Sequence, residues 1–126
     1  MKERAYENLK AAAMLAKDAD VFPNAATTRA YYAAYLACWW QLNQKGERTP
    51  VTEDGDEYFP HKKIADLARR RCVLDDDLAE KLDYLRDQRV RADYYPDGVA
   101  PAEARAAVAD AELLVSHLVG AWDDRS

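Results

Sequence analysis

The stretch LAEKLDYLRDQRVRADYY, residues 78–95, decides the fold. Its apolar side chains recur at three- and four-residue steps, which puts them on one face of a helix: Leu78, Leu82, Leu85 and Ala92. Arg89 falls on the same stripe, so its guanidinium is directed toward the interior, where an unpaired charge is strongly unfavourable. Asp93 lies one turn further on and is the expected partner. The sequence PDG at 96–98 then ends the helix with a turn.

The remaining sequence predicts an all-α protein. The 126 residues are enough for one hydrophobic core and too few for two, so residues 1–126 form a single domain. Hydrophobic residues make up 49% of the chain, with only four Gly and five Pro, and this composition favours helices. We expect an up-and-down bundle of about five helices at 2–20, 24–44, 61–72, 75–94 and 101–122.

The second predicted helix is the most apolar part of the chain. Small side chains form a strip along it: Ala26, Ala30, Ala33 and Ala37. A helix that is apolar all round is either central to the bundle or half buried in a homodimer. Arg29 lies on an apolar line of this helix, so we expect it to point inward as well. The tyrosines and tryptophans of this helix are typical of core residues.

Charge and motifs exclude several function classes. A net charge of −5 argues against a protein that coats nucleic acid, so any RNA contact is local. The predicted helix 61–72 carries a surplus of four positive charges, which suggests a phosphate-facing patch or simply a solvated face. The acidic loop 45–60 lacks the ligand spacing of a calcium site. No glycine-rich phosphate loop, zinc-spaced His pair or G-x-S-x-G is present, so we expect no cofactor and no metal.

Cysteine usage and hydropathy predict the compartment. Cys38 and Cys72 follow no disulfide or redox pattern, and the N-terminus is too polar for a signal peptide. No apolar run approaches the roughly 18 to 20 residues of a membrane span. We therefore expect a soluble, reduced, cytoplasmic protein with no membrane association.

Two sequence blocks resemble a known family. Residues 89–94, RVRADY, are similar to the R-x-x-A-D-Y signature of small HEPN-domain proteins (higher eukaryote and prokaryote nucleotide-binding). Residues 28–35, TRAYYAAY, resemble the N-R-A-Y-Y-A-x-F block of the same family, with Thr28 in place of Asn, Tyr35 in place of Phe, and Leu36 where His is frequent. His61, ahead of a basic and apolar stretch, also matches. The resemblance covers about half of the chain and implies a bundle of four to five helices.

The resemblance also implies a function and partners. HEPN ribonucleases carry Arg, then four to six residues, then His, and this chain has Tyr94 where the shortest form of the motif puts His. Tyrosine, with a pKa near 10, is a poor general base at neutral pH but can donate to a phosphate. Such proteins form homodimers and are frequently encoded beside a minimal nucleotidyltransferase in toxin-antitoxin or defence modules.

The predicted site combines these residues. We expect Asp93 to link Arg29 and Arg89 beneath a cleft into which Tyr94 and Tyr95 project, with His61 as a secondary nucleotide- or RNA-binding candidate. Three functions stay open: a nucleotide- or RNA-binding HEPN subunit beside a nucleotidyltransferase-like partner, a metal-independent ribonuclease toxin using Arg89 and Tyr94, and an interaction scaffold. The first is favoured because the motif His is missing.

Overall fold

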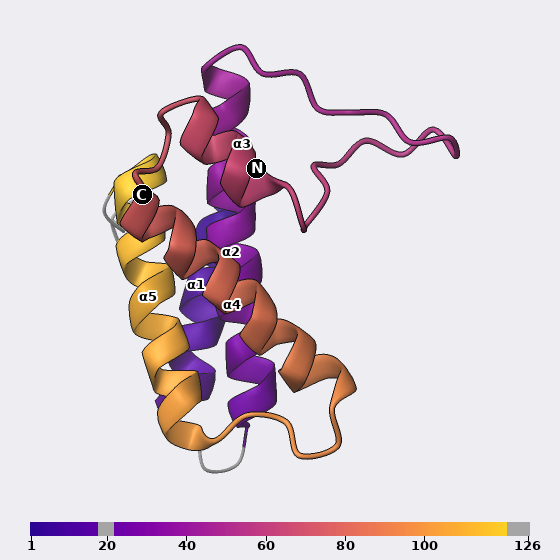
Figure 1. Ribbon diagram of the computed structural model, residues 1–126. Coiled ribbons are helices and arrows are strands. Elements are labelled where there is room, and N and C mark those ends of the chain that lie inside the picture. Colours follow the sequence, from indigo (N-terminus) through magenta and orange to yellow (C-terminus); the bar gives the residue numbers. More distant parts are fainter. Residues whose placement is uncertain (18–21, 121–126) are drawn as a thin grey trace.

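The computed structural model describes residues 1–17 and 22–120 and contains five helices in that part of the chain (Figure 1). They are α1 (Lys2–Lys17), α2 (Pro23–Gln44), α3 (Ile64–Arg70), α4 (Asp76–Tyr94) and α5 (Pro101–Val119). The described residues include no strand, and a single isolated bridge joins Val51 and Glu57. The predicted all-α bundle is therefore confirmed. The predicted ends of the first and last helices, 18–20 and 121–122, lie outside the described residues.

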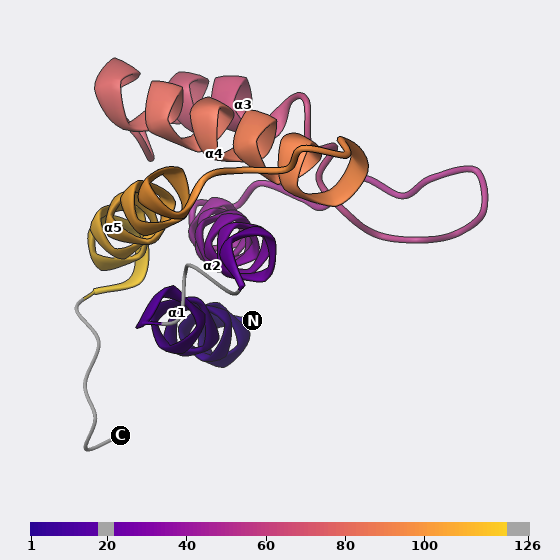
Figure 2. The same cartoon turned by 90° about the horizontal axis from the view of Figure 1, so that it is seen from below.

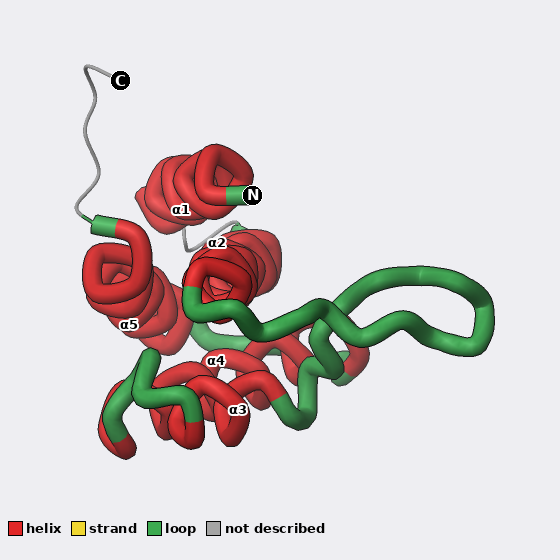
Figure 3. The backbone as a smooth tube through the Cα atoms, turned by 90° about the horizontal axis from the view of Figure 1, so that it is seen from above, coloured by secondary structure: helices red, strands yellow, loops and turns green. Residues whose placement is uncertain are grey.

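Helix α2 is the centre of the bundle. It packs against α1, α3, α4 and α5, and Figures 2 and 3 show it lying between α1 on one side and α4 on the other. The predicted strip of small side chains is fully buried: Ala26, Ala30, Ala33 and Ala37. Small side chains let neighbouring helices approach closely. The apolar excess that suggested a homodimer is thus largely buried within the chain itself.

Local sequence explains where most helices begin. Pro23 and Pro101 lie in the first turns of α2 and α5, where a missing N–H sacrifices no hydrogen bond. Asp75 caps α4, because its carboxylate accepts from the Leu78 N–H at 2.8 Å. Such a cap contributes about 0.5–2 kcal/mol.

The basic helix is shorter than the predicted range 61–72. It begins at Ile64, and residues 61–63 form a turn in which the Ile64 N–H donates to the Pro60 carbonyl at 3.1 Å. After Arg70 the chain turns again, with Cys72 at a positive φ of 58°. His61 is consequently not the start of a helix. Its side chain is instead held by α2.

The tight turn between α4 and α5 packs against the start of α2. Gly98 has φ of +61°, and a Cβ atom at this position would collide with the Asn24 side chain. The Val99 N–H donates to Asn24 Oδ1 at 2.9 Å. Gly98 therefore serves both the left-handed turn and the close approach of Asn24.

The segment between α2 and α3 extends away from the helices and returns to them (Figure 1). Near its tip the Thr52 N–H donates to the Asp56 carbonyl at 2.7 Å. It rejoins the bundle at Phe59, which is buried, and at His61. This long loop thus brings His61 to the surface of α2.

Two further expectations concern hydropathy and the cysteines. No helix in the described part of the chain is long and apolar enough to cross a bilayer. Cys38 is buried on α2, Cys72 is exposed after α3, and both are free thiols. Burial raises the pKa of the Cys38 thiol to about 12, so this cysteine is a packing residue.

Candidate functional site

Arg89 is directed inward from α4 and is held on several sides. Its Nε lies 3.0 Å from Asp93 Oδ2, and its side chain is only 17% exposed. The N–H of Nε is not aimed at the carboxylate well enough for a hydrogen bond, so this contact is an ion pair. A second guanidinium nitrogen donates to the Tyr32 hydroxyl at 3.0 Å. The guanidinium also lies 5.4 Å from the Tyr32 ring centre and 5.8 Å from that of Tyr94.

Asp93 joins the two sequence blocks, although through a different residue from the one predicted. Its Oδ1 accepts a hydrogen bond from the Thr28 hydroxyl at 2.5 Å, across 65 positions of sequence. Arg29 is exposed, and its guanidinium donates to Asn8 Oδ1 on α1 at 3.2 Å. The prediction that Asp93 links Arg29 with Arg89 is therefore wrong. Helix α2 is packed on nearly all sides, so the apolar residues at helical spacing from Arg29 do not show that Arg29 lies on its remaining exposed edge.

His61 belongs to an aromatic cluster on α2. Its Nδ1 lies 2.6 Å from the hydroxyl of Tyr31, which is fully buried. Its ring stacks on Tyr35 with centres 4.3 Å apart and an interplanar angle of 28°. Burial lowers the pKa of His61, and the positive charges of Arg89 and Arg86 lower it further. The imidazole is therefore neutral near pH 7.

A groove of about 390 Å³ opens between α1, α2 and the end of the long loop. We call it the cationic groove, and its polar lining comes from three segments: Arg4, Asn8, Arg29, Tyr32, Tyr58 and His61. Its other lining residues are aromatic or aliphatic side chains of α2, and none of the lining residues is Asp or Glu. The groove thus combines two exposed guanidiniums with aromatic rings.

The model of the HEPN domain family matches residues 1–121. The chain belongs to the HEPN family. A search of curated proteins and a search of solved structures found no match. The resemblance inferred from two short blocks is confirmed, and the match extends over nearly the whole chain.

Two of the site residues predicted for this HEPN domain lie in solvent. Tyr94 is 69% exposed and Tyr95 is 59% exposed, so they do not project into a cleft. They follow Asp93 at the end of α4, where Tyr94 is the last helical residue and Tyr95 the C-cap. Tyr94 nevertheless stays in contact with the site because its ring lies over Arg89.

Other residues at or near the candidate site were not singled out from the sequence. Arg4 and Asn8 reach the groove from α1, and no local pattern relates α1 to the motif blocks. Arg86 lies one turn before Arg89, and its buried Nε has no hydrogen-bond partner among the described residues. In the sequence, the feature that could have identified Arg86 is its position three residues before Arg89, which puts both side chains on one face of the helix. Tyr31 and Tyr32 stand in the family block, but they were interpreted as core residues alone.

The basic surface around α3 is partly neutralised. Arg69 pairs with Asp66 at 2.7 Å and with Asp76 at 2.9 Å, and Arg71 pairs with Glu47 at 3.2 Å. The net positive charge expected from the sequence of this helix is therefore reduced by acids from elsewhere in the chain. This surface is therefore a weaker candidate for a phosphate site than the cationic groove.

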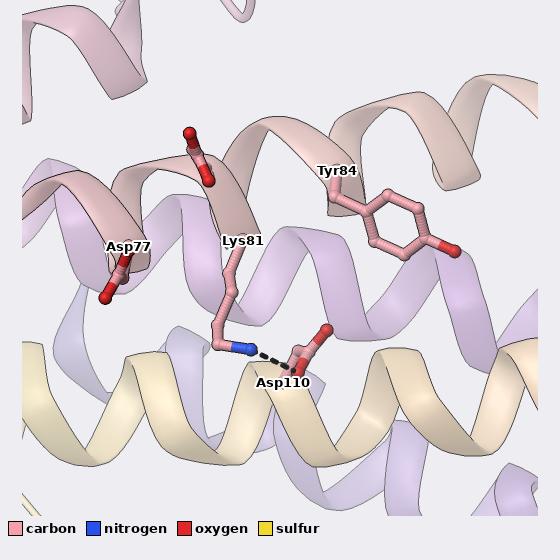
Figure 4. A pocket seen from close by; sticks show the side chains of 5 residues that line it. Asp77, Lys81, Tyr84 and Asp110 are labelled. Carbon is pink, nitrogen blue, oxygen red and sulfur yellow. Dashed lines mark hydrogen bonds and ion pairs between the residues drawn. The ribbon is translucent and has the colours of Figure 1, made fainter.

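A second hollow, of about 470 Å³, lies between α4 and α5 (Figure 4). Its charged lining is mostly acidic: Asp77, Glu80, Asp110 and Lys81. Lys81 Nζ lies 3.4 Å from Asp110 Oδ1, so its single positive charge is already paired. Its excess negative charge disfavours an anionic ligand, and the cationic groove is the better candidate although it is smaller.

Proposed function

We propose that this HEPN protein binds a nucleotide or RNA in the cationic groove. One observation carries the proposal: Arg4 and Arg29 are exposed beside aromatic rings, and no carboxylate lines the groove, in a chain whose net charge is −5. Neither arginine makes an ion pair within the described residues, so both guanidinium groups can donate to phosphate oxygens. The exposed ring of Tyr58 and the half-buried rings of Tyr32 and Trp39 suit a stacked base.

Arg89 and Asp93 support this site from α4. Arg89 donates to the Tyr32 hydroxyl, and Tyr32 lines the groove, so Arg89 fixes one of its walls. The part of its guanidinium that remains exposed adds positive potential next to the groove. Tyr94 and Tyr95, exposed at the end of α4, offer further stacking surface beyond Arg89.

The test is a binding measurement with a labelled single-stranded RNA of about 12 nucleotides, titrated at several salt concentrations. We expect the Arg4→Ala, Arg29→Ala double variant to bind at least about tenfold more weakly than the wild type. Losing two phosphate contacts should reduce the salt slope by about 1.4, or about 0.7 for each contact to a single strand. AMP and ATP in the same assay show whether a mononucleotide is enough.

The matched control is Arg105→Ala on α5, which removes one exposed arginine far in sequence from the groove residues. It should bind RNA as the wild type does. Equal binding by the double variant and the wild type would contradict the proposal. Equal losses in the double variant and in Arg105→Ala would mean that the attraction is nonspecific.

A second candidate function is metal-independent RNA cleavage by Arg89 and Tyr94. The favouring observation is the contact between the Arg89 guanidinium and the exposed Tyr94 ring, which puts an anion-binding group beside an accessible hydroxyl. Cleavage in excess EDTA that is lost in Tyr94→Phe would support it. RNA that is bound but remains intact would support binding without cleavage. No binding at all would favour the scaffold function.

We also propose partners on the basis of family membership. A homodimer and a nucleotidyltransferase-like protein from a toxin-antitoxin or defence module are the partners that HEPN membership suggests. Because α2 buries most of its apolar surface within the chain, the dimer proposal rests on the family. Light scattering at tens of micromolar tests it, and a monomeric mass would contradict it. Reconstitution with the neighbouring gene product tests the second partner.

A further inference from the structure

The bond between Tyr31 and His61 restricts where the imidazole proton can lie. The Tyr31 hydroxyl is fully buried, and His61 Nδ1, at 2.6 Å, is its only hydrogen-bond partner among the described residues. A buried hydroxyl needs an acceptor for its proton. Burial raises the pKa of Tyr31, so the hydroxyl keeps this proton near pH 7.

Two arrangements of the bond can be compared. If Tyr31 donates to Nδ1, its proton is satisfied and the neutral imidazole carries its own proton on Nε2. If Nδ1 carries the proton instead, the Tyr31 proton has no acceptor in the interior. The cost of one buried unsatisfied group corresponds to a preference of roughly 5- to 150-fold for the first arrangement.

The orientation of the ring is also restricted. Tyr35 stacks on one face of His61, and the Tyr32 ring stands at 89° to the imidazole with the two ring centres 6.0 Å apart. With Nδ1 held by Tyr31, the remaining polar atom of the imidazole is Nε2. His61 lines the cationic groove between α2 and the loop.

We propose that Tyr31 is a positioning residue that fixes His61 in its Nε2–H tautomer, so that the groove offers a neutral N–H donor to an oxygen of the bound phosphate. The ligand part of this inference rests on the proposed function, whereas the tautomer does not. His61 then donates a hydrogen bond to the ligand and does not accept a proton from it. Together with Arg4 and Arg29 it gives the groove a third donor for an acceptor-rich ligand.

The first test is ¹⁵N NMR of the imidazoles in the free protein. The chain contains only two histidines, so His117→Gln assigns the signals. His117 Nε2 lies 3.2 Å from the Val73 carbonyl oxygen, which can only accept, so His117 is an internal reference for a protonated Nε2. We expect His61 to show an unprotonated Nδ1 and a protonated Nε2.

The variant for this test is Tyr31→Phe, which removes the hydroxyl and keeps the ring. We expect the Nδ1 signal of His61 to lose its hydrogen-bond shift and the Nδ1–H tautomer to gain population. Tyr35→Phe is the matched control, because its hydroxyl binds the Phe59 carbonyl and not the imidazole. It should leave the His61 tautomer unchanged. A protonated Nδ1 in the wild type, or a spectrum that Tyr31→Phe does not alter, would overturn the role of Tyr31.

The second test measures the donor with the same RNA. A Gln amide reaches about as far as Nε2, whereas an Asn amide reaches only as far as Nδ1. We expect His61→Asn and Tyr31→Phe to bind roughly 2- to 10-fold more weakly, the range of one neutral hydrogen bond, and His61→Gln to bind close to the wild type. Thermal melts confirm that each variant is folded. Equal binding by His61→Asn and His61→Gln would overturn the donor role of His61. If the wild type bound no RNA, the proposed function would be overturned, and the NMR measurement alone would decide the tautomer.

Discussion

The Thr28 hydroxyl on α2 donates to the Asp93 carboxylate on α4 at 2.5 Å, and this contact fixes the antiparallel register of the two helices. One turn further along α2 and one turn back along α4, Tyr32 accepts from Arg89. The two contacts therefore repeat at the four-residue spacing of a helix face. They join the two sequence blocks by which the chain resembles the HEPN family.

The Thr28 contact predicts a difference between two substitutions. Thr28→Val removes the hydroxyl, and we expect a loss of about 1–2 kcal/mol in the free energy of unfolding, since the acceptor is charged but partly exposed. Thr28→Ser keeps the hydroxyl and should lose less than half as much. Urea denaturation followed by circular dichroism measures both. Little or no loss in Thr28→Val, which keeps the methyl group, would mean that the hydrogen bond does not matter.

Arg89 should matter for stability far more than its neighbour Arg91. Arg89→Ala leaves Asp93 without its cation and removes the bond to Tyr32, and we expect a loss of about 3 kcal/mol. Arg91 pairs with Glu103 at 2.9 Å, but both side chains are more exposed, so Arg91→Ala should lose about 1 kcal/mol. Denaturant melts compare the two variants. Similar stability in both, with RNA binding lost only in Arg89→Ala, would instead assign Arg89 chiefly to the ligand.

The stability of the protein should fall in mildly acidic solution because of His61. Burial lowers its pKa in the folded state, helped by Arg89 and Arg86, whereas the unfolded chain binds the proton near the usual pKa of 6.5. Below pH 6.5 the folded state therefore binds fewer protons than the unfolded state. The contribution of neutral His61 to the free energy of unfolding is fully present above pH 6.5 and is lost as the pH falls below it.

The measurement is the free energy of unfolding at about pH 7.5 and about pH 5.5, for the wild type and His61→Gln. Gln does not titrate, so the variant should lose less stability across this interval. The same pH dependence in both proteins would show that His61 is not protonated differently in the folded and unfolded states.

Gly98 and Gly46 form a matched pair for testing the turn after α4. Both have positive φ, +61° and +88°, but a Cβ atom at Gly98 meets the Asn24 side chain whereas one at Gly46 meets nothing within 4 Å. Gly46→Ala should lose about 1–2 kcal/mol from its backbone conformation. Gly98→Ala should lose at least about 1 kcal/mol more, because Asn24 must move and release the Val99 N–H. Thermal melts that rank the two variants equally would contradict the role of Asn24.

The sequence alone determined the helices and the inward Arg89. Apolar spacing, the prolines that open α2 and α5, and the Asp75 cap are local features, so they located helix starts to within a residue or two for α2, α4 and α5. Arg89 was placed correctly because an acid one turn away on the same helix also shares its face. The prediction for the start of α3 was wrong, since Pro60 and the contact of His61 with Tyr31 place the first turn later.

Only the tertiary structure decided which charged and aromatic residues meet. Arg29 lies on an apolar line of α2, yet it is exposed and faces Asn8 of α1, because the packing of four other helices leaves that edge of α2 open. Thr28 and Asp93, or Tyr31 and His61, are separated by 65 and 30 positions, so no local periodicity relates them. Spacing along a helix specifies which residues share its face. Which neighbour covers that face depends on how the helices pack, and that packing creates the cationic groove and holds Nδ1 of His61.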